Sequence, residues 1–344
     1  MNTPILGITM GDPAGIGPEI TAKALADPVV RKAARLLVIG DARVMTTAAR
    51  LARADLAVRP LGRLADATWA PHLVEVLDLG NADPAAFAVG RVSALCGRAA
   101  YEYIERGVTL ALAREIDAIV TAPISKEALA AAGLAHSGHT EILAELTGTR
   151  AYAMLLMGRD LRVIHVTTHV ALRRVPDLVT RERVLRTIRL GHEAMRRLGL
   201  AAPRIAVCGL NPHAGEAGLF GDEEQLTIGP AIAEARVEGI DATGPYPADT
   251  LMSRARGGEF DCVVAMYHDQ GHTPVKTLGF RYDEATKTWT GMSGVNVTVG
   301  LPILRVSVDH GTAFDRAGRG TANPESMVEA ITVAAQMAGR RASS

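Results

Sequence analysis

Aromatic residues are scarce in this sequence: Phe, Trp and Tyr together account for only 4% of the 344 residues. Since apolar residues still make up 48% of the chain, the core must be built mainly from Ala, Val, Ile and Leu. An excess of charge is also missing, because 37 Lys and Arg residues balance 37 Asp and Glu residues. This balance excludes the chain-wide basic surface that attracts nucleic acid or an acidic membrane. An anionic ligand would have to be held by a local cluster of cations.

Cysteine is rare as well, and Cys96, Cys208 and Cys262 lie far apart within apolar stretches. That pattern is typical of buried thiols and argues against a disulfide framework or a thiolate metal site. No uninterrupted apolar run approaches the 18 or so residues of a membrane-spanning helix, and the first residues lack the pattern of a signal peptide. We therefore expect a cytoplasmic protein with no membrane partner.

Short apolar runs alternate with longer amphipathic stretches through most of the chain. The runs typical of β-strands lie at 5–10, 36–40, 73–79, 117–122, 151–157, 162–169, 204–210, 261–268, 295–299 and 303–309. Helical periodicity is found at 19–26, 91–115, 180–198, 223–237 and 325–340. This alternation predicts an α/β protein with mostly parallel sheets flanked by helices. The length predicts two α/β/α lobes, and we place the first at residues 1–122 with 302–344 and the second at 123–301.

Three of the apolar runs deliver a histidine at or just past the strand end: His169, His213 and His268. Ligands of such folds bind beyond the carboxyl ends of the strands, and three neutral imidazoles can hold a divalent ion there. Imidazole ligands suit zinc, cobalt, iron or nickel. The alternative for each histidine is a hydrogen-bonded strand end. His165 lies an even number of residues from His169, which would place it on the same side, and we keep it as a structural alternative. Polar residues that could orient the imidazoles are Asn211, Glu216, Asp269 and Gln270.

Two further groups of polar residues suit a phosphate or a carboxylate. His139 and Thr140 precede an apolar-periodic stretch, so they lie near a predicted helix N-terminus, where backbone N–H groups favour anions. Lys276, Asn296 and Arg305 lie in or beside the last apolar runs, where cations are unexpected unless they face a cleft. The alternatives are an ordinary helix cap for the first group and solvated side chains for the second.

Two glycine-rich segments complete the set of candidates. GDPAGIGPE (11–19) follows the first strand but is neither a dinucleotide fingerprint nor a phosphate-binding P-loop, because the spacing of both is missing. It reads as a tight turn into a helix that starts near Pro18 and Glu19. DHGTAFDRAGRGTANPES (309–326) has glycines that permit close approach of a ligand to the backbone.

Taken together, the motifs GDPAGIGPEI, TAPISK, GHTE, NPHAGExGLFGxEE, GPYPADT, YHDQGHTPVK and GVNVTVGLPILRVSVDHGTAFDRAGRG resemble the 4-hydroxythreonine-4-phosphate dehydrogenase family of vitamin B6 biosynthesis. The resemblance runs from about residue 5 to residue 322 in the family's order. The two glycine-rich segments are also similar to GDGIGPE and HGSAPDIAGKGIANP of isocitrate and isopropylmalate dehydrogenases. Those enzymes bind the adenosine part of NAD at the second segment, which accounts for a dehydrogenase without the usual fingerprint.

The resemblance implies an isocitrate dehydrogenase-like fold with an active-site cleft between the lobes, and a homodimer whose active site is shared between subunits. It implies that His169, His213 and His268 bind one divalent metal, which would be zinc, cobalt or magnesium, with one of the three contributed by the neighbouring chain. It further implies a set of substrate-binding residues, His139, Thr140, Lys276, Asn296 and Arg305. Asp249 matches an acidic residue of the same site, and Lys276 or Asp249 would relay a proton. The NAD (or NADP) loop would contribute Gly311, Thr312, Asp315 and Gly318.

The activity implied by the resemblance is the oxidation of 4-phosphooxy-L-threonine by NAD, with decarboxylation to 3-amino-2-oxopropyl phosphate. One departure opens an alternative within the family. Members devoted to vitamin B6 synthesis usually lack residues equivalent to 281–293, and His272 and Pro274 are similar to a branch acting on D-threonate or D-erythronate 4-phosphate, which gives dihydroxyacetone phosphate. Outside the family, three imidazoles could equally activate water in a metal-dependent phosphatase, and a phosphosugar-binding regulator is the non-catalytic alternative.

Overall fold

The computed structural model describes residues 3–136, 138–158, 160–285, 288–292 and 294–340. The chain divides into two compact units, of which the first comprises Met1–Ala151 with Leu301–Gly339 and the second comprises Tyr152–Gly300 with the C-terminal end. The first boundary lies later than the expected one after residue 122. The physical reason is packing, because helices α5 (Lys126–Ala131) and α6 (His139–Leu146) contact α4 (Ala94–Leu112) of the first unit.

The first unit contains a wholly parallel sheet. Its strands are β1 (Ile5–Thr9), β2 (Arg35–Gly40), β3 (Ala57–Leu61), β4 (Leu73–Asp78), β5 (Ala118–Thr121) and β14 (Arg305–Val308). They lie in the order β3, β4, β2, β1, β5, β14, and every pair between them is parallel. The strand contributed by the C-terminal part of the chain therefore pairs with β5, which explains why residues beyond 300 return to this unit.

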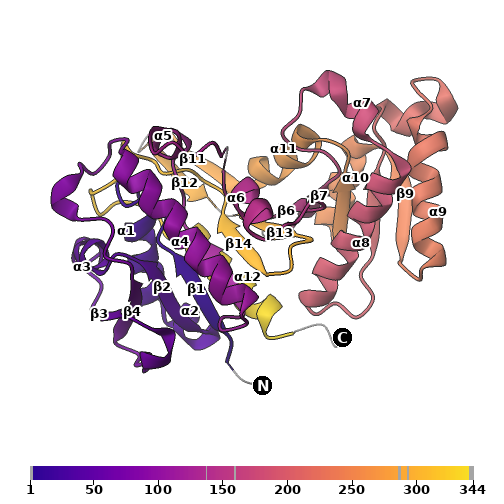
Figure 1. Cartoon of the computed structure of the whole chain (residues 1–344). Helices are drawn as coiled ribbons and strands as arrows, with labels where there is room; N and C mark the ends of the chain where they lie inside the picture. Colours follow the sequence, from indigo (N-terminus) through magenta and orange to yellow (C-terminus); the bar gives the residue numbers. More distant parts are fainter. Residues whose placement is uncertain (1–2, 137, 159, 286–287, 293, 341–344) are drawn as a thin grey trace. The chain divides into compact units, whose positions relative to one another are not determined.

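Helices cover both faces of this sheet. Figure 1 shows α4 crossing β1 and β2, where Gly107 lets the helix approach Thr9 and Ile39. The other helices are α1 (Gly17–Ala26), α2 (Pro28–Ala33), α3 (Ala42–Leu51) and α12 (Glu325–Ala338). Of these, α12 packs on β5 and β14, and α1 contacts α2, α3 and α12. The side chains of a strand alternate between faces, so Leu6 and Ile8 are buried on the side away from Gly107.

The second unit is built around a mixed sheet. Its strands are β6 (Ala153–Met157), β7 (Arg162–His165), β8 (Ile205–Cys208), β9 (Ala242–Tyr246), β10 (Cys262–Ala265) and β13 (Val295–Val299). In the order β13, β6, β7, β10, β8, β9, the first two pairs are antiparallel and the other three are parallel. The prediction of mostly parallel sheets between helices is therefore confirmed.

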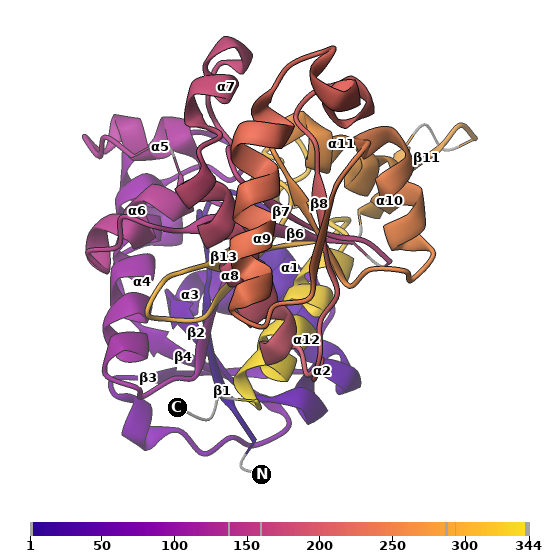
Figure 2. The same cartoon turned by 90° about the vertical axis from the view of Figure 1, so that its right-hand side faces the viewer.

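The helices of the second unit also lie on two faces. They are α7 (Val175–Leu178), α8 (Arg181–Arg197), α9 (Gly229–Val237), α10 (Ala248–Arg256) and α11 (His268–Gly279). A buried cluster joins α10 and α11 to the strands through Leu251, Val263 and Val275, whereas α8 packs on the opposite face through Gly191, which approaches Ile164. Figure 2 shows α8 and α9 side by side.

Several elements escaped the sequence analysis for identifiable reasons. β3 and β9 are edge strands interrupted by Pro60 and Pro245, and proline weakens the strand pattern. Pro274 lies inside α11 and conceals a helix. The segment 281–293 forms an antiparallel pair of strands, β11 (Phe280–Asp283) and β12 (Thr288–Met292), although 286–287 and 293 lie outside the described residues. All three cysteines are free and buried, as predicted. Among the described residues, no helix is both long and apolar enough to cross a membrane.

Candidate functional site

The three strand-end histidines of the sequence analysis follow three neighbouring parallel strands of the second unit. His169 comes four residues after β7, His213 five residues after β8 and His268 three residues after β10. Because β7, β10 and β8 are adjacent and parallel, their carboxyl ends lie at one edge of the sheet. The topology thus directs all three imidazoles to the edge where ligands of parallel sheets bind.

The structure brings two of these three imidazoles together. The rings of His169 and His268 lie with their centroids 5.7 Å apart, close enough for both to share one ion at Zn–N distances of about 2.1 Å. The Nδ1 atom of His268 lies 2.6 Å from Oδ1 of Asp269, which fixes the tautomer with its lone pair on Nε2. A carboxylate behind a histidine ligand is the usual arrangement in metal sites, so these residues fit a divalent metal.

His213 does not join that pair. Its ring lies beside Phe220, with the centroids 6.2 Å apart, and the described residues contain no group of three His, Cys, Asp or Glu side chains able to hold a metal. His213 opens a stretch of left-handed backbone in which His213, Ala214, Gly215, Glu216 and Ala217 all have positive φ. Nothing in the sequence pattern predicted this conformation.

A second pair of histidines lies behind the first. His165 and His272 are 2% and 6% exposed, and burial lowers the pKa of His165 to about 4 and that of His272 to about 3. Nδ1 of His165 donates to the carbonyl of Met154, so Nε2 of His165 is the acceptor 3.1 Å from Nδ1 of His272. The ring of His272 stacks on His268 at 3.7 Å. His165 and His272 therefore lie behind His268, with the ring of His272 packed against it and His165 bonded to His272.

Helix α11 presents further polar groups on one face. His268, His272 and Lys276 are spaced by four residues, which places them on the same side of the helix, and the charge of Lys276 contributes to the low pKa of His272. Asp249 lies in the first turn of α10, is exposed, and accepts a hydrogen bond from the backbone of Thr250. Asn296 is half-buried on β13, opposite Leu156 of β6.

A buried cation marks the first unit. Arg305, at the start of β14, is 3% exposed and donates from Nε and Nη2 to Oγ1 of Thr121 at 3.1 and 2.8 Å. Burial lowers its pKa to about 9, which means that the loss of hydration outweighs the stabilisation by its neighbours. A buried guanidinium suits an anionic ligand, because its N–H groups form charge-assisted hydrogen bonds to phosphate or carboxylate oxygens.

His139 adds to this anion site. It is the first residue of α6, its ring bonds to the backbone of Ala122, and its Nε2 atom is enclosed without a hydrogen-bond partner among the described residues. Burial and the neighbouring charge of Arg305 hold the pKa of His139 well below its ordinary value. Thr140 follows at the second position of the same helix. The structure thus brings together His139, Thr140 and Arg305, which the sequence placed in separate groups.

The two glycine-rich segments meet in the first unit. The backbone N–H of Ile16 donates to the carbonyl of Thr312 at 3.0 Å, and Gly15 lies against the side chain of Thr312. The buried carboxylate of Glu19 accepts from the N–H groups of Gly320 and Ala322, while Lys23 donates to the carbonyls of the same two residues. The loop after β14 is therefore fixed to the first turn of α1. Gly311 and Asp315 lie on this loop and are exposed.

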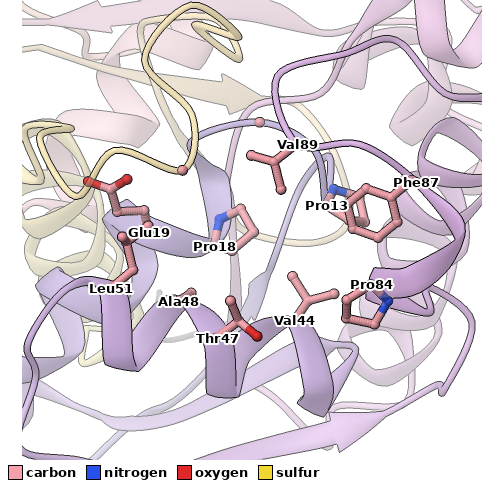
Figure 3. A pocket seen from close by; sticks show the side chains of 12 residues that line it. Pro13, Pro18, Glu19, Val44, Thr47, Ala48, Leu51, Pro84, Phe87 and Val89 are labelled. Carbon is pink, nitrogen blue, oxygen red and sulfur yellow. The ribbon is translucent and has the colours of Figure 1, made fainter.

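A pocket opens where these segments meet α3 (Figure 3). Its empty volume is about 450 Å³, open solvent included. The lining is mostly apolar and includes Pro18, Val44, Leu51, Phe87, Val89 and, from the loop, Gly318. Glu19 is the charged residue of the lining, and its carboxylate is already bonded to the loop and to Lys23. Such a pocket suits a flat, uncharged ring rather than a charged group.

The chain is similar to known proteins over nearly its whole length. Residues 32–334 match the family described as pyridoxal phosphate biosynthetic protein PdxA. The chain is 51% identical over 340 residues to a D-threonate 4-phosphate dehydrogenase of Cupriavidus necator, covering 98% of each chain. It is 49% identical over 335 residues to a 4-hydroxythreonine-4-phosphate dehydrogenase of Geobacter metallireducens, covering 97% of this chain and 96% of that one. The crystal structure of a 4-hydroxythreonine-4-phosphate dehydrogenase from Burkholderia phymatum is 46% identical and superimposes with a TM-score of 0.84, covering 98% and 99% of the two chains.

Proposed function

The chain belongs to the PdxA family and is a dehydrogenase of 4-phosphorylated hydroxy acids, and from this premise we propose that its substrate is D-threonate 4-phosphate. In the proposed reaction the hydroxyl at C3 is oxidised by NAD, and the resulting β-keto acid loses C1 as carbon dioxide to give dihydroxyacetone phosphate. The observation that carries a phosphorylated substrate is the buried guanidinium of Arg305, whose pKa burial lowers to about 9. His139 and Thr140 at the N-terminus of α6 supply further donors for the same phosphate.

Two observations support D-threonate 4-phosphate over its amino counterpart. The relative of Cupriavidus necator with 51% identity carries that name. The chain also contains residues 281–293 and the His272 and Pro274 pattern, which are similar to this branch of the family. 4-Phosphooxy-L-threonine remains the second candidate, supported by the 49% identical relative of Geobacter metallireducens. The two substrates differ at C2, which carries a hydroxyl in one and an ammonium in the other.

We assign the metal to His169, His213 and His268, with zinc, cobalt or magnesium as the ion and a second copy of the chain completing the set. The proximity of His169 to His268 supports an ion shared by these two rings, and the second copy would complete the set of ligands. An ion held by these histidines would supply positive charge next to the oxygen at C3, and NAD or NADP would be the oxidant. Lys276 or Asp249 would relay the protons: the proton of the C3 hydroxyl is accepted when the ketone forms, and a proton is returned to C2 after carbon dioxide leaves.

We place the dinucleotide at the loop after β14. Gly311, Thr312, Asp315 and Gly318 would contact its adenosine part, and the apolar pocket beside Gly318 would take the adenine ring. The Glu19 and Lys23 bonds to this loop support the assignment, because they fix its backbone before the cofactor binds.

The experiment is NADH formation followed at 340 nm in the presence of Co²⁺, with D-threonate 4-phosphate, D-erythronate 4-phosphate and 4-phosphooxy-L-threonine in parallel. We expect the highest kcat/KM for D-threonate 4-phosphate and its loss in His213→Ala, with the exposed His72→Ala as matched control. A preference for 4-phosphooxy-L-threonine would make the protein a vitamin B6 enzyme. If none of the three substrates yields NADH, while the protein still binds metal and releases phosphate, the result would favour a metal-dependent phosphatase.

A further inference from the structure

The left-handed turn that carries His213 requires tertiary contacts that stabilise its backbone conformation. Residues with a β-carbon rarely adopt positive φ, and here His213, Ala214, Glu216 and Ala217 do so in close succession, with φ between 42° and 54°. Such a stretch persists only where the surrounding structure enforces it. The turn begins right after β8, where the backbone of Asn211 accepts a hydrogen bond from Ala214 at 3.1 Å.

The buried carboxylate of Glu224 provides this enforcement. Glu224 is 4% exposed and lies at the start of a π-helical turn, Glu224–Ile228, that leads into α9. Its Oε1 accepts from the backbone N–H of Leu210 at 2.7 Å and of Asn211 at 2.8 Å, and its Oε2 accepts from Nδ2 of Asn211 at 3.0 Å. One carboxylate therefore satisfies both backbone donors that lead into the turn.

The glycines around this carboxylate show how closely it is packed. A β-carbon on Gly215 would lie 2.6 Å from Oε2 of Glu224, and one on Gly209 would lie 3.0 Å from Oε1. Gly215 also has a φ of 82°, which glycine adopts without strain. The turn thus folds back onto Glu224 itself.

A second link ties this strand end to the one that carries His268. Nε2 of Gln270 donates to the carbonyl of Gly209 at 2.8 Å, and its Oε1 accepts from the backbone of Met266 at 2.6 Å. The exit of β8 is therefore fixed from two sides, by Glu224 and by Gln270.

We infer that Glu224 is a positioning residue for the metal site: it holds the left-handed turn in the conformation that presents the imidazole of His213. The inference rests on the proposed function, in which His213 is a metal ligand. Glu224 does not touch the ion. It acts through the backbone of Leu210 and Asn211, and its charge matches the three donors that converge on it.

The test compares Co²⁺ affinity of the full-length protein with that of Glu224→Gln, measured by equilibrium dialysis and by the visible absorption of bound Co²⁺. Glutamine is uncharged and has one acceptor oxygen in place of two, so it cannot accept from both backbone N–H groups and from Nδ2 of Asn211 at once, and any bond that it keeps to the backbone is weaker. We expect the Kd for Co²⁺ to rise about 10- to 100-fold and the absorption band to change, and we expect excess Co²⁺ to restore NADH formation. Glu223→Gln is the matched control, because Glu223 also bonds to the Asn211 amide but not to the backbone.

His213→Ala is measured in parallel to separate the two hypotheses. If His213→Ala loses Co²⁺ and Glu224→Gln binds it as the wild type does, the inference about Glu224 is wrong and the metal assignment stands. If His213→Ala retains full Co²⁺ affinity, the metal assignment itself fails, and the inference with it. Should Glu224→Gln not fold, Gly215→Ala displaces the same carboxylate, and wild-type Co²⁺ affinity in that variant would likewise overturn the inference.

Discussion

The buried guanidinium of Arg305 allows a prediction in which stability and function move in opposite directions. Burial lowers its pKa from the ordinary arginine value to about 9, which corresponds to a cost on the order of 5 kcal/mol for keeping the charged form in this site. Arg305→Met removes that cost but also removes hydrogen bonds, among them two to Thr121, each of which contributes about 1 kcal/mol. We therefore expect the variant without ligand to be more stable by about 1–3 kcal/mol.

The assay is thermal unfolding of both proteins with and without substrate or inorganic phosphate. For a unit of this size, 1 kcal/mol shifts Tm by about 2–4 °C, so Arg305→Met without ligand should melt about 2–12 °C higher than the wild type. The wild type should gain stability from the phosphorylated ligand, and the variant should not, with KM for substrate raised at least 100-fold. An Arg305→Met protein that melts lower than the wild type and is still stabilised by phosphate would refute the reasoning.

Two further predictions concern the first unit. A β-carbon on Gly97 of α4 would overlap the backbone carbonyl of Ala128 in α5, so Gly97→Ala should lower the free energy of unfolding in urea by about 1–3 kcal/mol, although alanine favours helices. Gly107→Ala in the same helix should change it by less than about 1 kcal/mol, because the nearest neighbour of that β-carbon would lie at 3.3 Å. Equal effects of the two substitutions would contradict the packing argument. Burial raises the pKa of Asp12 to about 6, so the folded protein binds its proton more tightly than the unfolded chain and stability falls as the pH rises from about 4 to 6. Asp12→Asn should remove this dependence and be more stable at pH 7 by about 2–3 kcal/mol, and an unchanged pH profile in the variant would show that Asp12 does not titrate in this range.

The sequence alone predicted the positions of the candidate site residues wherever a short stretch of chain determines both the strand and the side chain that follows it. Apolar runs that end in histidine predicted three strands and the side chains beyond them, and β7, β8 and β10 begin within one residue of the predicted starts. The order of these strands in the sheet could not be predicted from any short stretch of the sequence. That β10 lies between β7 and β8, so that His169 meets His268, depends on pairing with one strand 100 residues away in the sequence and with another 57 residues away.

The parts that could not be predicted have a common cause, which is that tertiary contacts override local preference. Proline and glycine in HDQGHTPVK conceal α11, although this helix aligns His268, His272 and Lys276. The left-handed turn at His213 has no sequence signature beyond Gly215 and Gly218, and Glu224, which holds it, is eleven residues further on. The meeting of Arg305 with His139 joins residues from the two separate stretches of chain that make up the first unit.

The pairing of β14 with β5 also affects how the chain is made. Residues 152–300 are contiguous, so the second unit has all of its strands once about 300 residues have left the ribosome. At that moment the first unit, although its synthesis began earlier, still has β5 (Ala118–Thr121) as an edge strand. Neither β14, which pairs with β5, nor α12, which packs on it, has yet been made. An apolar strand with open hydrogen-bonding groups readily joins other chains during synthesis. The last 40 residues therefore complete the first unit, and a nascent chain that stops before residue 305 leaves this unit without β14 and α12.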